Sequence, residues 1–505
     1  MKSLMKSVSL AVSLGLAFPV TAAIPPVYVV KDLGAVLDPA ATAPATSKGR
    51  GLNNLGHVVG DNENGIEFDP VTYPGSSLEH AFLHDGASMQ ELGALTGDNR
   101  SIAFAVNDSD VIVGYSTADD SALLDHAFRY DPVTQVMEPI PALSGGTKNI
   151  AKSINASGRI AGDSYDYDKS MIADAADRAF YCDDPCGASE LNRVPTLTGY
   201  QDETGDNNYA DGINDNGQVI GYSFIRLVTD NSVVPPDTGI FNHAYIYDPA
   251  TDTLTDLGTL LADNLGDSYA YGANNSGQVV GESQVVGVDP GTQQPALFSH
   301  AYLYNPPSGG NPTGAMSDLG NLADGLFSTA NDINDLGQVV GVGSRENSAD
   351  GWDHAFIYDS ATSPTIVDLN DRIPAGSGWV LKDASKINSK GQITGYGEHN
   401  GEIHAFLLTP DSDSDGVGDT TDNCTLVPNA NQRDTNGDGF GNICDPDFNG
   451  NKIVDPQDFS TLKSVFGKTG YPDQDLNGNG IVDPQDFSIL KSYFGKKPGP
   501  SGLVP

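Results

Sequence analysis

A short unit recurs seven times along this chain, and no other feature of the sequence constrains the fold as strongly. The clearest copy opens with Ile-Asn-Asp-Asn-Gly-Gln-Val-Ile-Gly-Tyr at residues 213–222. It continues with His-Ala-Tyr-Ile-Tyr-Asp-Pro at 243–249 and closes with Thr-Asp-Leu-Gly-Thr-Leu at 255–260. Asn216-Gly217 predicts a tight hairpin, because both residue types accept the positive φ that such a turn requires. With the segment that leads into Ile213, the unit predicts four short strands.

The copies stay in register although their lengths differ. The glycine of the second strand recurs at spacings of 54, 48, 59, 60, 60 and 54 residues, at Gly60, Gly114, Gly162, Gly221, Gly281, Gly341 and Gly395. A His-Ala-aromatic strand follows at His80, His126, His243, His300, His354 and His404, with Arg178 in the third copy. The closing strand is predicted at Leu92-Gly93, Ile140-Pro141, Val194-Pro195, Leu257-Gly258, Leu319-Gly320 and Leu369-Asn370.

The seventh closing strand is displaced to the other end of the repeat region. The last copy passes His404 and stops at Pro410 without a closing strand, whereas Tyr28–Leu33 has that strand's pattern near the N-terminus. Four strands in a period of about 50 residues are typical of a β-propeller. We therefore predict a mainly β fold over residues 24–410, a seven-bladed propeller closed by the N-terminal strand. An open β-solenoid is the alternative, but it would not explain the displacement.

The recurring Ile-Asn-x-x-Gly-x-Val-x-Gly and His-Ala-Phe segments resemble the HAF family of probable extracellular repeat proteins. The resemblance covers most of the chain beyond residue 23 and recurs in register. It implies bacterial export and no settled biochemical activity.

Composition narrows the partners and the compartment. The chain has 67 acidic and 26 basic residues, a formal charge of −41, so we expect no nucleic-acid partner and no direct membrane insertion. Residues 1–23 are predicted to be a signal peptide, with Lys2 and Lys6 before the apolar run Val8–Val20 and the small residues Thr21-Ala22-Ala23 after it. The protein is therefore expected to be secreted, and its four cysteines to form local disulfides, Cys182 with Cys186 and Cys424 with Cys444.

The composition changes after Pro410, where residues 411–505 contain fifteen Asp and no Glu. Four twelve-residue windows carry acidic or amide side chains at positions 1, 3, 5, 9 and 12, with a main-chain carbonyl at position 7. Fourteen of the fifteen Asp occupy these positions and only Asp473 does not, which favours Ca²⁺ binding over a disordered acidic linker. The predicted ligands are Asp411, Asp413, Asp415, Val417, Asp419 and Asp422; Asp434, Asn436, Asp438, Phe440, Asn442 and Asp445; Asp447, Asn449, Asn451, Ile453, Asp455 and Asp458; Asp475, Asn477, Asn479, Ile481, Asp483 and Asp486.

The two halves of this tail resemble different calcium-binding families. Residues 411–446, with Asp-Ser-Asp-Ser-Asp-Gly-Val-Gly-Asp, Asp-Asn-Cys and a later Cys-Asp, resemble thrombospondin type 3 repeats. Residues 447–495 resemble a dockerin type I module, a duplicated loop and helix. In each copy an Asp-Pro pair is expected to start the helix. Phe459, Leu462 and Phe466 then share one helical face, as do Phe487, Leu490 and Phe494.

Two departures from the dockerin pattern affect the expected partner. That family usually has hydroxyl residues just after the ninth loop position, where a cohesin binds, whereas both copies here have Pro-Gln (456–457 and 484–485). The partner of residues 447–495 is therefore left open between a cohesin-like and another cell-surface protein. Lys452 replaces the small residue often found at the sixth loop position, so we expect the third loop to bind calcium more weakly. Residues 496–505 are predicted to be a flexible end.

No catalytic motif is evident, so no catalytic residue is predicted. The six repeated histidines are expected to be structural, because repeat positions normally serve packing. The loops between second and third strands vary in length and are longest around Phe224–Phe241 and Ser283–Ser299, where a glycan or protein ligand and simple solvation are equally compatible. Two functions remain: a secreted, calcium-binding, non-catalytic binding, adhesion or scaffold protein, or an extracellular polysaccharide-degrading enzyme or its accessory.

Overall fold

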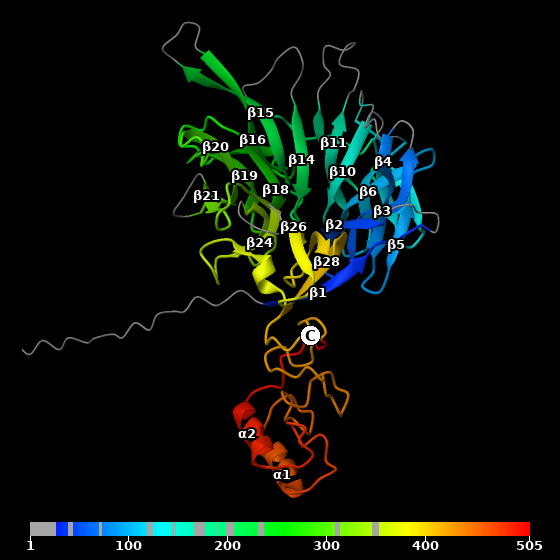
Figure 1. The fold of residues 1–505 in the computed structure, drawn as a ribbon, viewed down its shortest axis with the longest axis vertical. Helices are drawn as coiled ribbons and strands as arrows, with labels where there is room; N and C mark the ends of the chain where they lie inside the picture. Colours follow the sequence, from blue (N-terminus) through cyan, green and yellow to red (C-terminus); the bar gives the residue numbers. More distant parts are fainter. Residues whose placement is uncertain are drawn as a thin grey trace, which may run out of the picture.

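The chain folds as a seven-bladed β-propeller followed by a small tail with two helices (Figure 1). This computed structural model describes residues 27–38, 44–69, 73–118, 125–143, 146, 148–165, 177–187, 189–197, 207–230, 237–308, 314–345 and 353–504. The predicted signal peptide lies outside the described residues. In the described part of the chain, no helix combines the length and the apolar character needed to span a bilayer.

Each blade is a four-stranded antiparallel sheet whose strands follow one another in sequence order. Blade 1 contains β2 (Thr46–Leu52), β3 (Val58–Asp69), β4 (Tyr73–His84) and β5 (Met89–Gly93). Blade 2 contains β6 (Arg100–Val106), β7 (Ile112–Thr117), β8 (His126–Asp131) and β9 (Val136–Pro139), and blade 3 contains β10 (Lys148–Ile154), β11 (Arg159–Tyr165), β12 (Arg178–Asp183) and β13 (Asn192–Arg193). Blade 4 contains β14 (Asn208–Ile213), β15 (Val219–Asp230), β16 (Asp237–Asp248) and β17 (Thr253–Gly258).

The remaining blades follow the same order, except at the point of closure. Blade 5 contains β18 (Ser268–Ala273), β19 (Val279–Val288), β20 (Pro295–Asn305) and β21 (Ala315–Gly320). Blade 6 contains β22 (Ser328–Ile333), β23 (Gln338–Ser344), β24 (Asp353–Asp359) and β25 (Val367–Asp368). Blade 7 contains β26 (Trp379–Ile387), β27 (Ile393–His399) and β28 (Glu402–Asp411), and its fourth strand is β1 (Val27–Gly34).

The predicted ring closure is confirmed. β1 pairs antiparallel with β28, from Val27 opposite Asp411 to Gly34 opposite Ala405. Tyr28 is fully buried in the core of this blade together with Phe406. The Ala405 amide also donates a hydrogen bond of 2.9 Å to the Ser47 hydroxyl of blade 1, so the first and last blades are joined by side chains as well.

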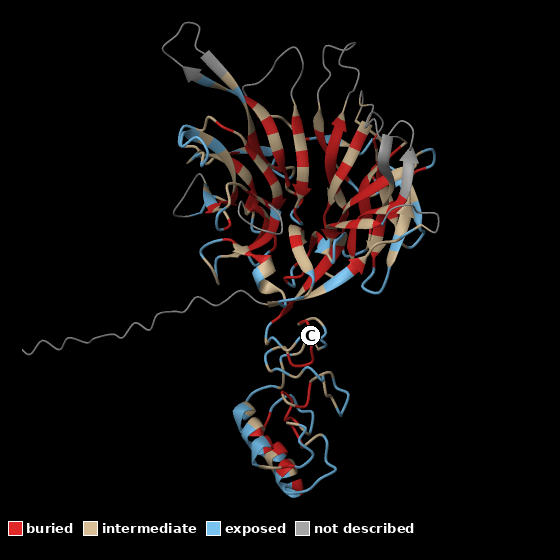
Figure 2. Cartoon of the chain, viewed as in Figure 1, coloured by how far each residue is buried: buried red, intermediate tan, exposed pale blue. Residues whose placement is uncertain are grey.

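The repeated residues explain how the blades pack. The alanine and aromatic residue that follow the repeated histidine, or Arg178 in blade 3, are fully buried in all seven blades, as in Ala244-Tyr245 and Ala405-Phe406. Figure 2 shows buried residues along the strands of the propeller. At the repeated glycine, a Cβ atom would collide with the carbonyl oxygen of the first strand, as it would at Gly221 against Tyr209. These glycines therefore serve close strand approach.

Three blades differ locally from the predicted strands. The closing strand of blade 2 ends at Pro139, before the predicted Ile140-Pro141. The closing strand of blade 6 ends at Asp368, and Leu369–Arg372 forms a 3-10 helix (η1) instead of continuing the strand. The Asp368 side chain accepts a hydrogen bond from the Asn370 amide and so caps this helix. The closing strand of blade 3 is reduced to two residues and is followed by Val194 outside the ladder.

The tail begins directly at the end of β28 and consists mainly of turns (Figure 1). Its two helices are α1 (Pro456–Val465) and α2 (Pro484–Tyr493), capped by Asp455 and Asp483 as predicted. Both predicted disulfides are present: Cys182 bonds to Cys186, and Cys424 bonds to Cys444. The Cys424–Cys444 bond lies in the half of the tail that has little apolar surface.

The expectation about the apolar helical faces of the tail is wrong in part. Leu462 and Leu490 are buried, and the rings of Phe459 and Phe487 lie 5.4 Å apart, but Phe466 is 46% exposed and Phe494 is 49% exposed. Each of these two residues is the C-cap, and its backbone angles are no longer helical, so its side chain leaves the apolar helical face.

Residues of the predicted flexible end make backbone hydrogen bonds to the rest of the tail. The Gly499 amide donates to the Cys444 carbonyl, and the Gly502 amide donates to the Asp422 carbonyl. The Pro500 carbonyl accepts from the Thr425 amide. The last described residues are thus held by backbone hydrogen bonds that could not be predicted from their Gly- and Pro-rich sequence.

Candidate functional site

The six repeated histidines each face a carboxylate. Their Nδ1 atoms lie 2.7–3.4 Å from the partner oxygen in the pairs His80–Glu91, His126–Asp98, His243–Asp256, His300–Asp318, His354–Asp368 and His404–Asp32. In five blades the carboxylate belongs to the closing strand, and only Asp98 lies outside it. This repeated hydrogen bond between the third and fourth strands agrees with the structural role predicted for these histidines.

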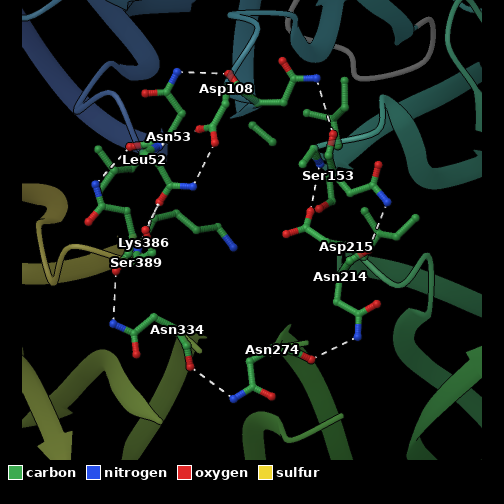
Figure 3. Close-up of a pocket in the computed structure, with 18 of the residues that line it drawn as sticks. Leu52, Asn53, Asp108, Ser153, Asn214, Asp215, Asn274, Asn334, Lys386 and Ser389 are labelled. Atoms are coloured by element: carbon green, nitrogen blue, oxygen red, sulfur yellow. Dashed lines mark hydrogen bonds between the residues drawn. The ribbon is translucent and has the colours of Figure 1, made fainter. Parts of the chain in front are cut away.

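The centre of the propeller contains a cavity of about 210 Å³ lined by the seven first strands and the turns after them (Figure 3). Seven asparagines surround it, one from each of these turns. Each donates from its Nδ2 atom to the main-chain carbonyl of the asparagine in the next blade, over 3.0–3.4 Å, and the last donates to the first. The asparagine ring consists of Asn53, Asn107, Asn155, Asn214, Asn274, Asn334 and Asn388.

The asparagine ring closes the end of the centre from which the tail leaves. Its residues belong to the turns between first and second strands, and Ile393, just after one such turn, pairs with Leu408 near the end of β28. Each asparagine Oδ1 atom also accepts an amide within its own turn, as Asn214 does from Gln218. The sequence signal for this ring was present, because the asparagine occurs in all seven copies, but we had not assigned it a role.

Half-buried tyrosines on the first and second strands gather in blades 3–5, away from the asparagine ring. The rings of Tyr209 and Tyr222 are stacked with centroids 4.6 Å apart, and the Tyr269 ring meets Tyr222 edge-on at 4.9 Å. Tyr165 and Tyr271 extend this tyrosine cluster at 6.3 and 6.4 Å from their nearest members. The alternation of these strands places the tyrosine side chains beside one another on neighbouring blades.

Charged side chains lie beside the tyrosine cluster in close ion pairs. Lys152 is 2.6 Å from Asp163 and 2.6 Å from Asp211 of the next blade. Burial opposes its charge, but these two carboxylates outweigh burial and raise the pKa of Lys152. In blade 1 burial raises the pKa of Glu79 to about 7, and Asp61 acts in the same direction against Arg100. These acids are held by cations, an arrangement suited to fixing charge in place.

The loops at this end are described only in part. Residues 283–299, predicted as a long loop, form most of the β19–β20 hairpin, whose turn is tied by the Asp289 side chain to Thr292. Val286 and Val288 are 67% and 60% exposed on this hairpin. Residues 224–241 continue the β15–β16 hairpin up to its tip, which lies outside the described residues.

The four acidic loops of the tail share one local geometry. The carboxylate at position 1 accepts the amide of position 6 in every loop, as Asp411 does from Gly416 at 3.0 Å and Asp475 does from Gly480 at 2.8 Å. The side chain at position 5 accepts the amide of position 7, as Asp415 does from Val417. These contacts curl each loop around its first carboxylate.

The remaining predicted ligands behave differently in the two halves of the tail. At position 9, Asp419 and Asn442 accept from the residue at position 2, whereas Asp455 and Asp483 cap the helices with one oxygen. The other oxygen of Asp455 turns back toward Asn451 in the loop, and Asp483 does the same toward Asn479. At position 12 the carboxylates are buried, with 0–7% exposure for Asp422, Asp445, Asp458 and Asp486.

The oxygen atoms of the first loop, residues 411–422, are suited to a hard cation. One oxygen each of Asp411, Asp413 and Asp415 lie within 4.8 Å of one another. Within the described part of the chain, the buried Oδ2 atoms of Asp413 and Asp422 have no hydrogen-bond partner. Burial and the neighbouring carboxylates raise the pKa of Asp413 to about 6. Oxygen donors alone, partly unpartnered and mutually repelling, are the donor set that calcium prefers.

The third loop differs from the others at position 6. Lys452 has φ +69°, in the left-handed region where Gly416, Gly439 and Gly480 lie in the other loops. A side chain in this conformation costs about 1–2 kcal/mol. The Lys452 amide nevertheless donates to Asp447 at 2.6 Å, so the loop keeps its shape with a strained residue.

Comparison with known proteins supports parts of this description. A family model described as a protein of unknown function, DUF3466, matches residues 263–442, which span blades 5–7 and the first two acidic loops. Thrombospondin-4-B of Danio rerio is 48% identical over 64 residues, a match that covers 11% of this chain and 7% of that protein. The chain thus spans only a small part of this relative. The resemblances to HAF repeats and dockerins remain predictions.

Several solved structures match about three quarters of this chain. The β-propeller domain of the Trilobed protease from Pyrococcus furiosus has a TM-score of 0.39 and 12% identity, covering 72% of this chain and 93% of that one. Oligogalacturonate lyase from Vibrio parahaemolyticus has a TM-score of 0.39 and 11% identity, covering 76% and 96%. Acylaminoacyl peptidase from Pyrococcus horikoshii has a TM-score of 0.40 and 10% identity, covering 72% and 51%. At these values the similarity says nothing about activity or ligands.

Proposed function

We propose that this chain is a secreted, calcium-binding, non-catalytic binding protein. In this proposal the propeller is the ligand platform, and the tail is a calcium-dependent spacer and docking module. The single observation that carries it is the repeated geometry of the four acidic loops, each curled around its first carboxylate and closed by a buried carboxylate at position 12.

Calcium supplies what these loops lack on their own. Several carboxylates of one loop lie close together, and buried oxygens such as Asp422 Oδ2 have no partner among the described residues. Burying such charge without compensation is costly, so a divalent cation would supply much of the folding free energy of the tail. Glycine at position 6 in three loops, with positive φ, favours the turn that calcium loops require.

The tyrosine cluster supports a glycan as the ligand of the propeller. Tyrosine offers an apolar face and a polar hydroxyl, which match the faces and edges of sugar rings, and Tyr209 and Tyr271 lie on innermost strands. The acids beside the cluster, Asp163 and Asp211, are both paired with Lys152, which suits binding better than proton transfer. Export fits the two local disulfides, because such bonds persist in oxidising compartments.

The tail would dock through its helical half. Gln457 and Gln485 are exposed at the starts of α1 and α2, in the positions where the resembling family binds its partner. Because these residues are amides rather than hydroxyls, we propose a cell-surface protein other than a standard cohesin. A pull-down with the full chain and with Gln457→Ala/Gln485→Ala would report whether this face is used.

Calorimetric titration of the full chain with calcium tests the main proposal. We expect two to four ions per chain, and a tail transition that disappears in chelator while the propeller transition persists. Binding of fewer than two ions, or melting curves identical with and without chelator, would contradict calcium binding.

A glycan array probed with the full chain in calcium tests the platform. Tyr209→Ala and Tyr271→Ala should reduce binding, whereas Tyr181→Ala, which removes a tyrosine that packs on Tyr247 in the outer part of the blades, should not. If the three variants behave alike, the tyrosine cluster is not the binding site, and calcium binding by the tail is unaffected as a proposal.

A further inference from the structure

Among the described residues, blade 7 contains a side-chain cluster that the other blades lack. Asp32 accepts from His404 Nδ1 at 3.0 Å, which is the pair found in each histidine-bearing blade, and its second oxygen lies 2.7 Å from His399 Nδ1. The three ligand atoms lie within 4.8 Å of one another. The side chains are 32%, 16% and 23% exposed for Asp32, His404 and His399, so the cluster is reachable from solvent.

Three different strands supply these residues. Asp32 belongs to β1, His399 ends β27 and His404 lies on β28, so the cluster joins the N-terminal strand to the last hairpin. His404 pairs with Gly397 in the ladder, which places His399 two residues further along on the same face. The sheet therefore fixes the positions of all three side chains.

In blade 6 the position that corresponds to His399 is occupied by Arg345. Arg345 and His399 each lie four residues after the repeated glycine, at Gly341 and Gly395. Arg345 contacts Asp368 at 2.8 Å, and Asp368 also accepts from His354 at 2.7 Å. In blade 6 the second partner of the carboxylate is therefore Arg345, which is always charged. In blade 7 the second partner is His399, and a neutral imidazole has a lone pair that can bind a metal ion.

We propose that Asp32, His399 and His404 bind one divalent transition-metal ion, with Zn²⁺ as the favoured ion. Two imidazole nitrogens and one carboxylate oxygen are a common zinc ligand set, and a water molecule would complete four-coordination. The ion would replace the hydrogen bonds between the imidazoles and Asp32 by coordination bonds. Each neutral imidazole would exchange its Nδ1 proton for one on Nε2 through solvent, so that Nδ1 offers its lone pair to the ion, and a protonated ring would release one proton. Because the ligands come from β1, β27 and β28, the ion would hold the ring closed.

The surroundings of His399 suit this role. Its Nε2 atom lies 2.9 Å from the Asn400 side-chain amide, whose oxygen can accept the Nε2 proton after an amide rotation and so orient Nδ1 toward the ion. The Trp379 ring stacks on the His399 ring, with centroids 4.6 Å apart and planes within 1°. This contact orients the imidazole and places a fluorescent reporter beside the site.

Calorimetric titration of the full chain with zinc chloride, in saturating calcium, tests the proposal. We expect one zinc ion per chain in addition to any that the tail binds, and a higher melting temperature of the propeller. His399→Arg reproduces the arrangement of blade 6, so it should keep the metal-free melting temperature but weaken this site by at least about tenfold. The control is His300→Gln, which removes the His300–Asp318 pair of blade 5. This blade has no counterpart of His399, so the variant should leave the zinc site unchanged.

The Trp379 reporter gives a second measurement that does not depend on a variant at the site. The sequence has two tryptophans, so Trp352→Phe leaves Trp379 as the single one. Addition of Co²⁺ should then quench its fluorescence with saturation, and zinc should restore it. Absence of saturable quenching, or equal zinc binding by the parent chain and His399→Arg, would overturn the proposal, and neither result would bear on calcium binding by the tail.

Discussion

Replacement of Asp486 tests how one buried carboxylate joins the fourth acidic loop to helix α2. Its side chain is 0% exposed. Its Oδ2 atom accepts the Asp483 amide at 2.7 Å and completes the capping box of α2, and its Oδ1 atom accepts the Asn477 amide at 3.1 Å. The same carboxylate is the twelfth residue of the loop, where a calcium ion would be bound by both oxygens.

The expected loss follows from these contacts. Hydrogen bonds to an ionised group contribute about 1.5–3 kcal/mol each, and loss of a cap costs about 1 kcal/mol. Because the two bonds and the cap involve the same carboxylate, the costs overlap, and we expect Asp486→Ala to destabilise the tail by about 3–5 kcal/mol in calcium. Asp486→Asn keeps one oxygen that can accept from the Asp483 amide, so we expect about half of that loss.

Differential scanning calorimetry of the full chain, in calcium and in chelator, measures the tail transition. A calcium titration of each variant should show one ion fewer for Asp486→Ala than for the parent chain. Asp473→Ala is the matched control, because Asp473 lies outside the ligand positions and contacts Thr435. If Asp486→Ala melted and bound calcium like this control, the calcium loop and the capping role assigned to Asp486 would both be wrong.

The other predictions concern single positions. Tyr28→Ala should lower the free energy of unfolding of the propeller by about 3–5 kcal/mol in urea, whereas Tyr28→Phe, which removes a buried hydroxyl without a partner among the described residues, should be neutral or stabilising. His243→Ala should cost about 1–3 kcal/mol in the same assay without loss of ligand binding. Burial opposes ionisation of Asp368, but hydrogen bonds from the His354 side chain and the Asn370 amide outweigh it and lower its pKa. Because the folded pKa lies below the unfolded one, this stabilisation is present above about pH 4 and lost in more acidic solution, so Asp368→Asn should flatten the acid side of a melting-temperature profile. Lys452→Gly should raise calcium affinity several-fold in a titration, because it relieves the strain at φ +69°; unchanged affinity would show that the strain is absorbed elsewhere.

Most of the fold could be predicted from the sequence repeat. Turn residues such as Asn216-Gly217, strand alternation and the repeated glycine act between near neighbours in the chain, so they can be recognised without knowledge of the three-dimensional fold. The displaced strand Tyr28–Leu33 predicted one contact between residues far apart in the sequence, because a last blade with three strands needs a fourth. The pairing of β1 with β28 followed that logic.

The acidic loops could also be predicted, because the residues that form each loop are close together in the sequence. Each predicted ligand set lies within twelve residues, and the contacts that curl the loop join positions 1, 5, 6 and 7. The exposure of Phe466 was not foreseen, because the helical period continues in the sequence beyond Val465, where the helix ends. The docking of Gly499 and Gly502 was missed since backbone hydrogen bonds leave no pattern in the side chains.

The sequence by itself thus determined the blades, the closing strand and the candidate calcium loops, all of which depend on residues close in the chain or on a counted repeat. Only the tertiary structure decided which side chains meet at the centre and at the point of closure. The seven asparagines bond to one another because the ring brings each turn beside the next, and His399 reaches Asp32 across 367 residues because β1 completes blade 7. Such contacts depend on the curvature and closure of the whole ring, and the sequence of a single repeat contains neither.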